Sequence, residues 1–205
     1  MNLLVMMVKI PVLAAVFLVY LSADDTLWID LDNTKINWVG RKVTGEHTGT
    51  VNLSKGWVIV ENDTLKSGLL VFDMNSIINT DIESPEWKLK LENHLKDEDF
   101  FAVDSFSKAT LKISGSQTLS DTNSVNNLQI MADLIIRGIT AGISFPIVLQ
   151  TSGGVFSAKG NVDINRTIYG IQYKSVKYFP NVGDKLIDDF FSVQFVLQTK
   201  TKGKK

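Results

Sequence analysis

The segment Leu128-Gln-Ile-Met-Ala-Asp-Leu-Ile-Ile-Arg137 has an apolar residue at every second position, starting from Leu128. Successive side chains of a β-strand point to opposite faces, so this period of two predicts a strand with one buried face. Gly138 ends the run. The same period returns in Ile143, Phe145, Ile147 and Leu149, which predict the antiparallel partner of the first strand.

Alternation of this kind recurs along most of the chain. The other candidate inward-facing sets are Ile36 and Trp38; Val51 and Leu53; Leu70, Phe72 and Met74; Leu111 and Ile113; Phe156 and Ala158; and Phe191, Val193 and Phe195. Ser54-Lys55-Gly56 predicts a tight turn between two strands. About eight to ten short antiparallel strands indicate an all-β barrel or sandwich. A closed barrel is favoured because it leaves no strand edge exposed.

One segment instead has helical spacing. Ser84 is the expected N-cap and Pro85 the first helical residue, and the helix should end near Asp97. Trp87, Leu91, His94 and Leu95 form its apolar stripe, and Phe100-Phe101 should turn back toward the barrel. A single helix among many strands usually covers one side or one mouth of the sheet. Ligand contact and simple packing are both open for this stripe.

Composition indicates an exported, single-domain protein. Residues 1–23 carry one lysine, an apolar run and Ser22-Ala23, which predicts a cleaved signal peptide, with an uncleaved membrane anchor as the alternative. Residues 24–199 form the expected barrel domain. The chain has no cysteine, so no disulfide supports it. Residues 200–205 form a basic tail, either solvated or weakly attracted to an anionic membrane.

The sequence argues against several classes of function. The net charge of −1 gives no electrostatic footprint for nucleic acid. The chain has two histidines and no cysteine, and neither a nucleophile system nor a cluster of metal ligands is apparent, so we expect no enzyme, metal or cofactor. We expect His94 to be a core histidine hydrogen-bonded to a neighbour, and His47 to be structural.

Several motifs, in order, resemble the YceI-like family between about Trp28 and Leu197. The motifs are Trp38-Val-Gly-Arg41, His47-Thr-Gly-Thr-Val51, Val71-Phe-Asp-Met-Asn-Ser-Ile77, Leu91-Glu-Asn-His-Leu-Lys-Asp-Glu-Asp-Phe-Phe101, Ala132-Asp-Leu-Ile-Ile-Arg-Gly-Ile-Thr140 and Val162-Asp-Ile-Asn-Arg-Thr-Ile-Tyr-Gly-Ile171. The resemblance implies an extended lipocalin-like antiparallel barrel of about eight strands, with one helix near a mouth. It also implies export to the periplasm or outside the cell, a possible homodimer, and a bound polyisoprenoid, fatty amide or other long-chain lipid.

Three positions depart from the family pattern. Phe106-Ser107 replaces the usual Tyr-Pro after the helix, Ala141 stands where a basic residue is usual, and Asn165 precedes Arg166 where an aspartate is common. None of them touches the strand pattern, but they leave the identity of the ligand open.

The first hypothesis is therefore a lipid carrier with an apolar cavity. Its expected ligand-binding residues are Trp38, Leu70, Phe72, Met74, Leu91, Leu95, Phe100, Phe101, Ile130, Leu134, Phe145, Ile147, Phe156, Phe191 and Phe195. Arg137 and Arg166 could bind a head group, or could instead fix a loop by pairing with Asp163, Asp188 or Asp189. A structural or stress-related envelope protein with a filled barrel, and an isoprenoid- or lipid-modifying enzyme, are the alternatives.

Overall fold

The computed structural model describes residues 26–120, 127–179 and 183–201. The predicted signal peptide and the end of the basic tail lie outside them. The strands are β1 (Thr26–Trp28), β2 (Lys35–Lys42), β3 (Gly45–Glu61), β4 (Thr64–Asn79), β5 (Lys108–Thr118), β6 (Leu128–Ile136), β7 (Ile139–Ser152), β8 (Val155–Asn165) and β9 (Ile187–Gln198). One α-helix, α1 (Pro85–Lys96), and two short 3₁₀ helices, η1 (Arg166–Tyr169) and η2 (Gly183–Lys185), complete the described fold.

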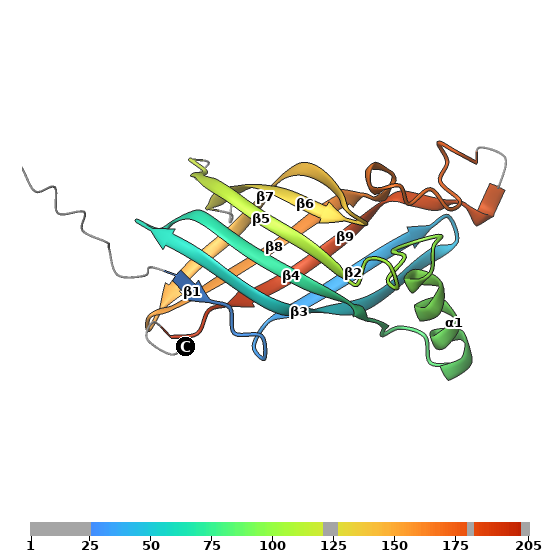
Figure 1. Ribbon diagram of the computed structural model, residues 1–205, viewed down its shortest axis with the longest axis horizontal. Coiled ribbons are helices and arrows are strands. Elements are labelled where there is room, and N and C mark those ends of the chain that lie inside the picture. The colour runs from blue at the N-terminus through green and yellow to red at the C-terminus, as the bar shows by residue number, and fades with distance from the viewer. Residues whose placement is uncertain (1–25, 121–126, 180–182, 202–205) are drawn as a thin grey trace, which may run out of the picture.

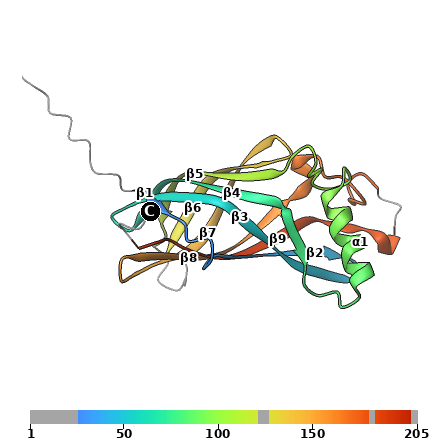
Figure 2. The same cartoon turned by 60° about the horizontal axis from the view of Figure 1, so that its bottom comes forward.

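The sheet closes on itself. Its strand order is β1-β3-β2-β9-β8-β7-β6-β5-β4, and β3 also pairs with β4. Strands β2 to β9 therefore form an eight-stranded antiparallel barrel. Strand β1 pairs with residues 57–59, near the end of β3. Figures 1 and 2 both show an elongated barrel with α1 at one end and β1 at the other. The predicted all-β barrel is confirmed.

The β6–β7 hairpin follows the sequence pattern closely. Leu128, Ile130, Ala132, Leu134 and Ile136 are all buried. In the register, Ile130 pairs with Phe145 and Ala132 with Ile143. The strands are joined by Arg137 and Gly138, whose φ angles are 51° and 72°. Positive φ at both loop residues is the geometry of the tight hairpin turn that matches strand twist.

The turn predicted at Ser54-Lys55-Gly56 is wrong, because β3 runs through it without a break. The pairing with β4 shifts between Leu53 and Lys55, so an irregularity in the ladder replaces a turn. A Cβ on Gly56 would lie 2.8 Å from Ile29 Cγ1 and 2.9 Å from Leu70 Cδ2. The glycine thus marks a close approach of Ile29, the residue after β1, to the barrel.

Helix α1 begins and ends where the sequence predicts, but its apolar stripe is not a buried one. Ser84 occupies the N-cap without a side-chain hydrogen bond. No residue of α1 is fully buried, and Trp87 is 58% exposed. The helix contacts the end of β4 and stands across the barrel end, so only its last turn reaches the interior. No helix among the described residues is long and apolar enough to cross a membrane.

A buried asparagine ties α1 to the barrel. Asn79 is fully buried at the end of β4, and its backbone N–H donates to Glu92 Oε1 at 2.7 Å. Its side-chain amide donates to Thr48 O at 3.0 Å and to the Asp81 carboxylate. Asp81 also accepts from Thr48 N–H at 2.7 Å and lies 2.9 Å from His47 Nδ1. His47 is therefore structural in this network.

The Asp81 network predicts an acid-side loss of stability. Partial burial by itself raises the pKa of Asp81, but hydrogen bonds from His47, Thr48 and Asn79 outweigh burial and lower the pKa below its ordinary value. A carboxyl with a lowered folded-state pKa stabilises fully above its unfolded pKa, and this contribution disappears as the pH falls through the folded pKa. We expect Asp81→Asn to lower the melting temperature by about 2–4 °C at about pH 7.

The two melting curves should converge as the pH falls below the unfolded pKa of about 3.9. Thermal melts between neutral and acidic pH, with the exposed Glu61→Gln as control, measure this difference. A constant gap between wild type and Asp81→Asn at all pH values would show that the carboxylate's charge is irrelevant.

Candidate functional site

The barrel encloses an apolar cavity of about 210 Å³. Its lining extends from Leu95 and Phe101 at the α1 end to Phe156 and Leu197 at the β1 end. The interior is therefore a long, narrow void rather than a local gap between two side chains. Engineered apolar cavities of about 150 Å³ stay free of water and bind small apolar molecules.

The side chains expected to bind a ligand largely converge on this cavity. The residues that line it are Trp38, Leu70, Phe72, Met74, Leu95, Phe100, Phe101, Ile130, Leu134, Phe145, Ile147, Phe156, Phe191 and Phe195. Leu91, one helical turn before Leu95 in α1, does not line it. Contact of these residues with a ligand stays a prediction.

Aromatic pairs occupy two levels of the interior. Phe145 and Phe195 meet edge to face at 6.0 Å, and Phe101 meets Phe191 at 6.1 Å nearer to α1. The Phe195 ring has room because Gly160 stands opposite it in the register. A Cβ on Gly160 would lie 2.5 Å from Phe195 Cζ and 3.2 Å from Ile147 Cγ2. The glycine thus sets where this ring sits in the cavity.

We expect Gly160→Ala to lower the free energy of unfolding by about 1–3 kcal/mol, because the added methyl group overpacks the Phe195 ring. Urea denaturation measures this change. Gly142→Ala is the matched control, since its Cβ would come no closer than 3.9 Å to another atom, Asp133 Oδ1. Equal stability of the two variants would mean that the Phe195 ring moves aside freely.

Two chain segments, one following α1 and the other following β8, cover the α1 end of the barrel and meet at an aromatic cluster. His94 stacks edge to face with Phe100 at 4.9 Å and with Tyr173 at 4.8 Å. Arg137 joins the same segments, since its guanidinium donates to Phe100 O at 3.0 Å and to Gly170 O at 3.4 Å. Arg137 also lies 3.9 Å from Glu98. His94 is half-buried, so its expected core position is only partly realised.

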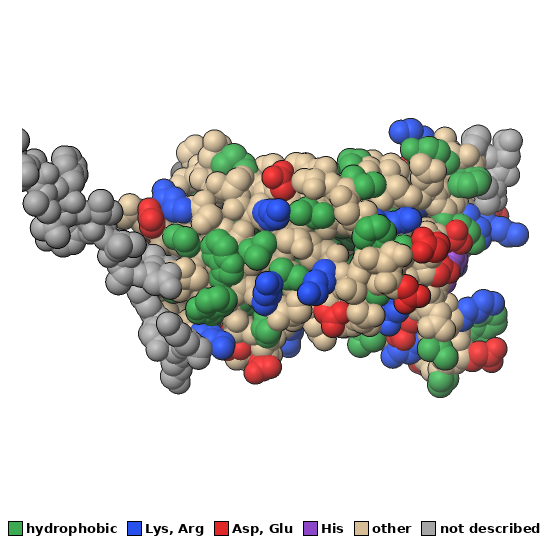
Figure 3. Space-filling model, in the orientation of Figure 1, with side chains coloured by type: hydrophobic (Ala, Val, Ile, Leu, Met, Phe, Trp, Pro, Cys, Tyr) green, Lys and Arg blue, Asp and Glu red, His purple; other side chains and the backbone are tan. Residues whose placement is uncertain are grey.

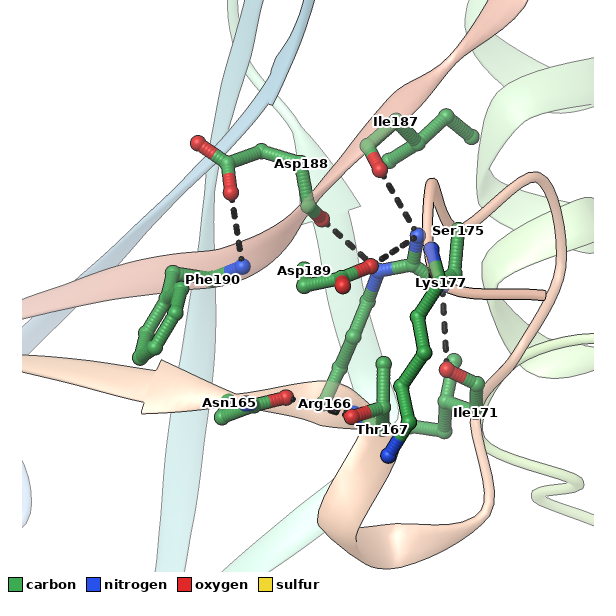
Figure 4. A network of polar contacts seen from close by, with 10 residues as sticks. All are labelled: Asn165, Arg166, Thr167, Ile171, Ser175, Lys177, Ile187, Asp188, Asp189 and Phe190. Carbon is green, nitrogen blue, oxygen red and sulfur yellow. Dashed lines mark hydrogen bonds and ion pairs between the residues drawn. The ribbon is translucent and has the colours of Figure 1, made fainter. Parts of the chain in front are cut away.

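Arg166 is the most buried charged residue in the described part of the chain, with an exposed fraction of 3%. Its guanidinium donates to Asp188 O at 2.8 Å, Ile187 O at 2.9 Å and Ile171 O at 3.0 Å (Figure 4). It also faces Asp189 Oδ1 at 3.6 Å, an oxygen that has no hydrogen bond among the described residues. Burial lowers the pKa of Arg166, and the charges of Asp189 and Asp188 oppose this.

Both arginines therefore bind backbone carbonyls, Arg137 those of the covering segments and Arg166 those of Ile171 and of the first two residues of β9. Asp189 pairs with Arg166, whereas Asp163 accepts from Ser192 Oγ at 2.6 Å and takes no part in this arrangement. The geometry favours the loop-fixing alternative over a free guanidinium waiting for a head group. Head-group binding by Arg137 or Arg166 stays a prediction that no described contact supports.

We expect Arg166→Met to lower the free energy of unfolding by about 3–5 kcal/mol, because it leaves the Asp189 carboxylate buried without its cation. Guanidinium chloride denaturation measures this loss, and the double variant Arg166→Met/Asp189→Leu should recover part of it. Wild-type stability of Arg166→Met together with a loss of bound lipid would instead assign Arg166 to ligand binding.

His94, Asp97 and Asp99 lie beside the aromatic cluster, with potential metal-ligand atoms within 4.8 Å of one another. The two aspartates are exposed, and His94 Nε2 lies 3.3 Å from Asp99 Oδ2. A histidine–carboxylate contact accounts for this group without a metal, so the absence of a metal site stays a prediction.

Sequence reasoning missed several residues that close the barrel. Tyr173 and Ile171 follow an irregular segment after β8, where no periodicity marks them. Asp189 was considered only as one of three partners for an arginine. Val58 and Val60 of β3 and Leu65 of β4 also line the cavity, and the predicted inward faces do not include them. The strand alternation of Trp57–Glu61 was the signal that could have found Val58 and Val60.

Comparison with known proteins agrees with this architecture. The model of the YceI-like domain family matches residues 28–199. No functionally curated protein matches the chain by sequence.

Three solved structures show the same fold. BcnA of Burkholderia cenocepacia superposes with a TM-score of 0.66 at 16% identity, covering 84% of this chain and 99% of that protein. A polyisoprenoid binding domain from Saccharophagus degradans, implicated in plant cell wall breakdown, has a TM-score of 0.62 at 18% identity, with coverages of 85% and 97%. A YCEI protein of Campylobacter jejuni superposes with a TM-score of 0.54 at 13% identity, covering 74% of this chain and 85% of that protein.

Proposed function

This chain belongs to the YceI-like family, and from that premise we propose that it is an exported carrier of a long apolar amphiphile. The proposed ligand is a polyisoprenoid or a fatty acyl or amide chain, held along the barrel axis. The single observation that carries the proposal is the narrow apolar cavity running between the two ends of the barrel. The name of the Saccharophagus degradans domain supports the same class of ligand.

The lining of the cavity favours contact with a hydrocarbon chain over recognition of polar groups. Almost all side chains that line it are aliphatic or aromatic, and its charged lining residues stand at the α1 end. Apolar burial contributes roughly 25 cal/mol per Å² of surface removed from water, which suffices to hold a long chain without hydrogen bonds. Carrier function therefore needs no catalytic group.

The size of the cavity bears on how the ligand fits. Ligand pockets usually measure roughly 300–1,000 Å³, and this one holds about 210 Å³. A long chain would enter with movement of flexible side chains such as Met74, which has three rotatable bonds and lines the void. The small volume is also the observation that favours the second candidate, an envelope protein whose barrel is filled by its own side chains.

Export and assembly belong to the proposal as well. The signal-like residues 1–23 suit a periplasmic or secreted carrier. A homodimer and transient contact with a membrane remain part of this hypothesis. An isoprenoid- or lipid-modifying enzyme is the less favoured alternative, because the charged groups nearest the cavity are engaged with the protein itself.

The test is mass spectrometry of an organic extract from protein purified from its own export compartment. We expect an isoprenoid or acyl species in near-stoichiometric amount. Ala158→Leu should reduce this species, because Ala158 lines the cavity and the larger side chain fills part of the void. Ser157→Leu is the matched control, since Ser157 is the neighbouring residue that does not line the cavity.

An extract without lipid, from both the wild type and the Ser157→Leu control, would contradict the carrier function and favour the filled barrel. Equal lipid content in wild type and Ala158→Leu would mean that the lipid binds outside the cavity.

A further inference from the structure

The loop between η1 and β9 holds apolar side chains out in solvent at the covered end of the barrel. Val176 is 56% exposed, Phe179 46% and Tyr178 39%. Scattered apolar residues are normal on a protein surface, but three on one short turn form a cluster. The turn spans Lys174 to Phe179 and is named the docking loop below.

The docking loop is an ordered turn built on a buried anchor. Ser175 is fully buried, and its carbonyl accepts the backbone N–H groups of Tyr178 at 3.1 Å and Phe179 at 2.8 Å. Its side-chain oxygen accepts from Lys177 N–H at 3.2 Å. The N–H of Ile187 in β9 donates to Lys174 O at 3.0 Å. The exposed side chains are thus presented by a preformed backbone, which limits the entropy lost on docking.

The docking loop carries positive charges that no described carboxylate neutralises in an ion pair. The sequence contains no aspartate or glutamate from residue 166 to residue 183. Lys174 Nζ lies 4.8 Å from the Tyr173 ring and Lys177 Nζ 5.4 Å from the Tyr178 ring. Within the part of the chain that the structure describes, neither ammonium group forms an ion pair with a carboxylate. Lysine stems beside tyrosine and phenylalanine are typical of segments that bind the membrane interface.

The apolar surface continues beyond the docking loop onto neighbouring segments. Ile168 of η1 is 54% exposed and Ile139 of β7 is 41% exposed. Ile139 Cδ1 would lie 3.7 Å from a Cβ on Gly170, so β7 and the segment after η1 are in contact. At the right-hand end of Figure 3, hydrophobic and basic side chains occupy the upper part, and carboxylates gather lower, around the histidine. Two exposed carboxylates, Asp184 of η2 and Asp188 of β9, follow the loop in the chain.

The docking loop also borders the cavity. Ile171 before it and Ile187 after it both line the void, as does Arg166. A surface that contacts the loop would therefore lie against the end of the barrel through which an apolar chain could pass.

We propose that the docking loop binds this end of the barrel to the surface of an anionic lipid bilayer, with Val176, Tyr178 and Phe179 in the interface and Lys174 and Lys177 near the lipid phosphates. This inference rests on the proposed carrier function and adds the place where the lipid is exchanged. A stable protein–protein contact buries roughly 1,200–2,000 Å², which one short turn does not offer, whereas interfacial insertion needs only a few apolar side chains and nearby cations.

The test is flotation of the full mature chain with vesicles of phosphatidylcholine and phosphatidylglycerol, compared with vesicles of phosphatidylcholine alone. We expect binding to the anionic vesicles that weakens with added salt. Val176→Ser/Phe179→Ser and Lys174→Ser/Lys177→Ser should each lower the partition coefficient by on the order of tenfold. Thermal melts of the variants check that the barrel is intact.

Two control variants remove similar groups elsewhere. Leu31→Ser changes an apolar side chain, 40% exposed, near β1 at the other end of the barrel, and Lys159→Ser removes an exposed lysine from β8. Both should bind vesicles like the wild type. Loss of binding in the controls, or unchanged binding in the loop variants, would overturn the proposal.

The organic extract separates this proposal from the carrier function. Lipid in the extract without vesicle binding would disprove docking and leave the carrier in place. Vesicle binding through the loop, with no lipid in the extract, would disprove the carrier and leave docking in place. Sedimentation equilibrium gives a further outcome: a dimer that the loop variants split into monomers would assign the loop to self-association and contradict the bilayer.

Discussion

Closure of the sheet is the constraint on which the rest of the structure depends. Once β3 pairs with β4 at one side and β2 with β9 at the other, every strand from β2 to β9 has a neighbour on both sides. No exposed backbone edge remains in the closed ring, and the side chains of each strand must alternate between interior and surface. The interior of eight strands is then narrow, and only apolar side chains can line it without unpaired polar groups.

The two ends of the barrel are closed in different ways. Near β1, Ile29 bridges to Thr199 after β9 and packs against Gly56 of β3, which ties both ends of the described chain to the barrel. At the α1 end, irregular segments cover the opening, and irregular backbone leaves carbonyl groups to satisfy. Arg137 and Arg166 supply the hydrogen-bond donors for that purpose. Basic residues at the mouth of an apolar cavity are therefore explained first by the backbone they support.

Strand alternation made most of this fold predictable, because the period of two is imposed by the same geometry that closes the barrel. It located the inward faces of β6, β7 and β9 and most of the cavity lining. It failed where local chemistry has two readings: Ser54-Lys55-Gly56 looks like a turn but is an irregular point in a continuous strand. It also failed for Trp87, since helical spacing shows which residues share a face but not whether that face meets the barrel. The docking loop had no periodicity at all, and only its exposure in three dimensions revealed it.

The most direct measurement of the central claim uses Trp38, the tryptophan that lines the cavity. In a variant with Trp28, Trp57 and Trp87 replaced by phenylalanine, delipidated protein would be titrated with a fatty amide brominated in mid-chain. A chain inside the barrel predicts saturable quenching of Trp38 fluorescence that Ala158→Leu reduces. Binding of the brominated amide without quenching of Trp38 would place the ligand outside the barrel and contradict the account.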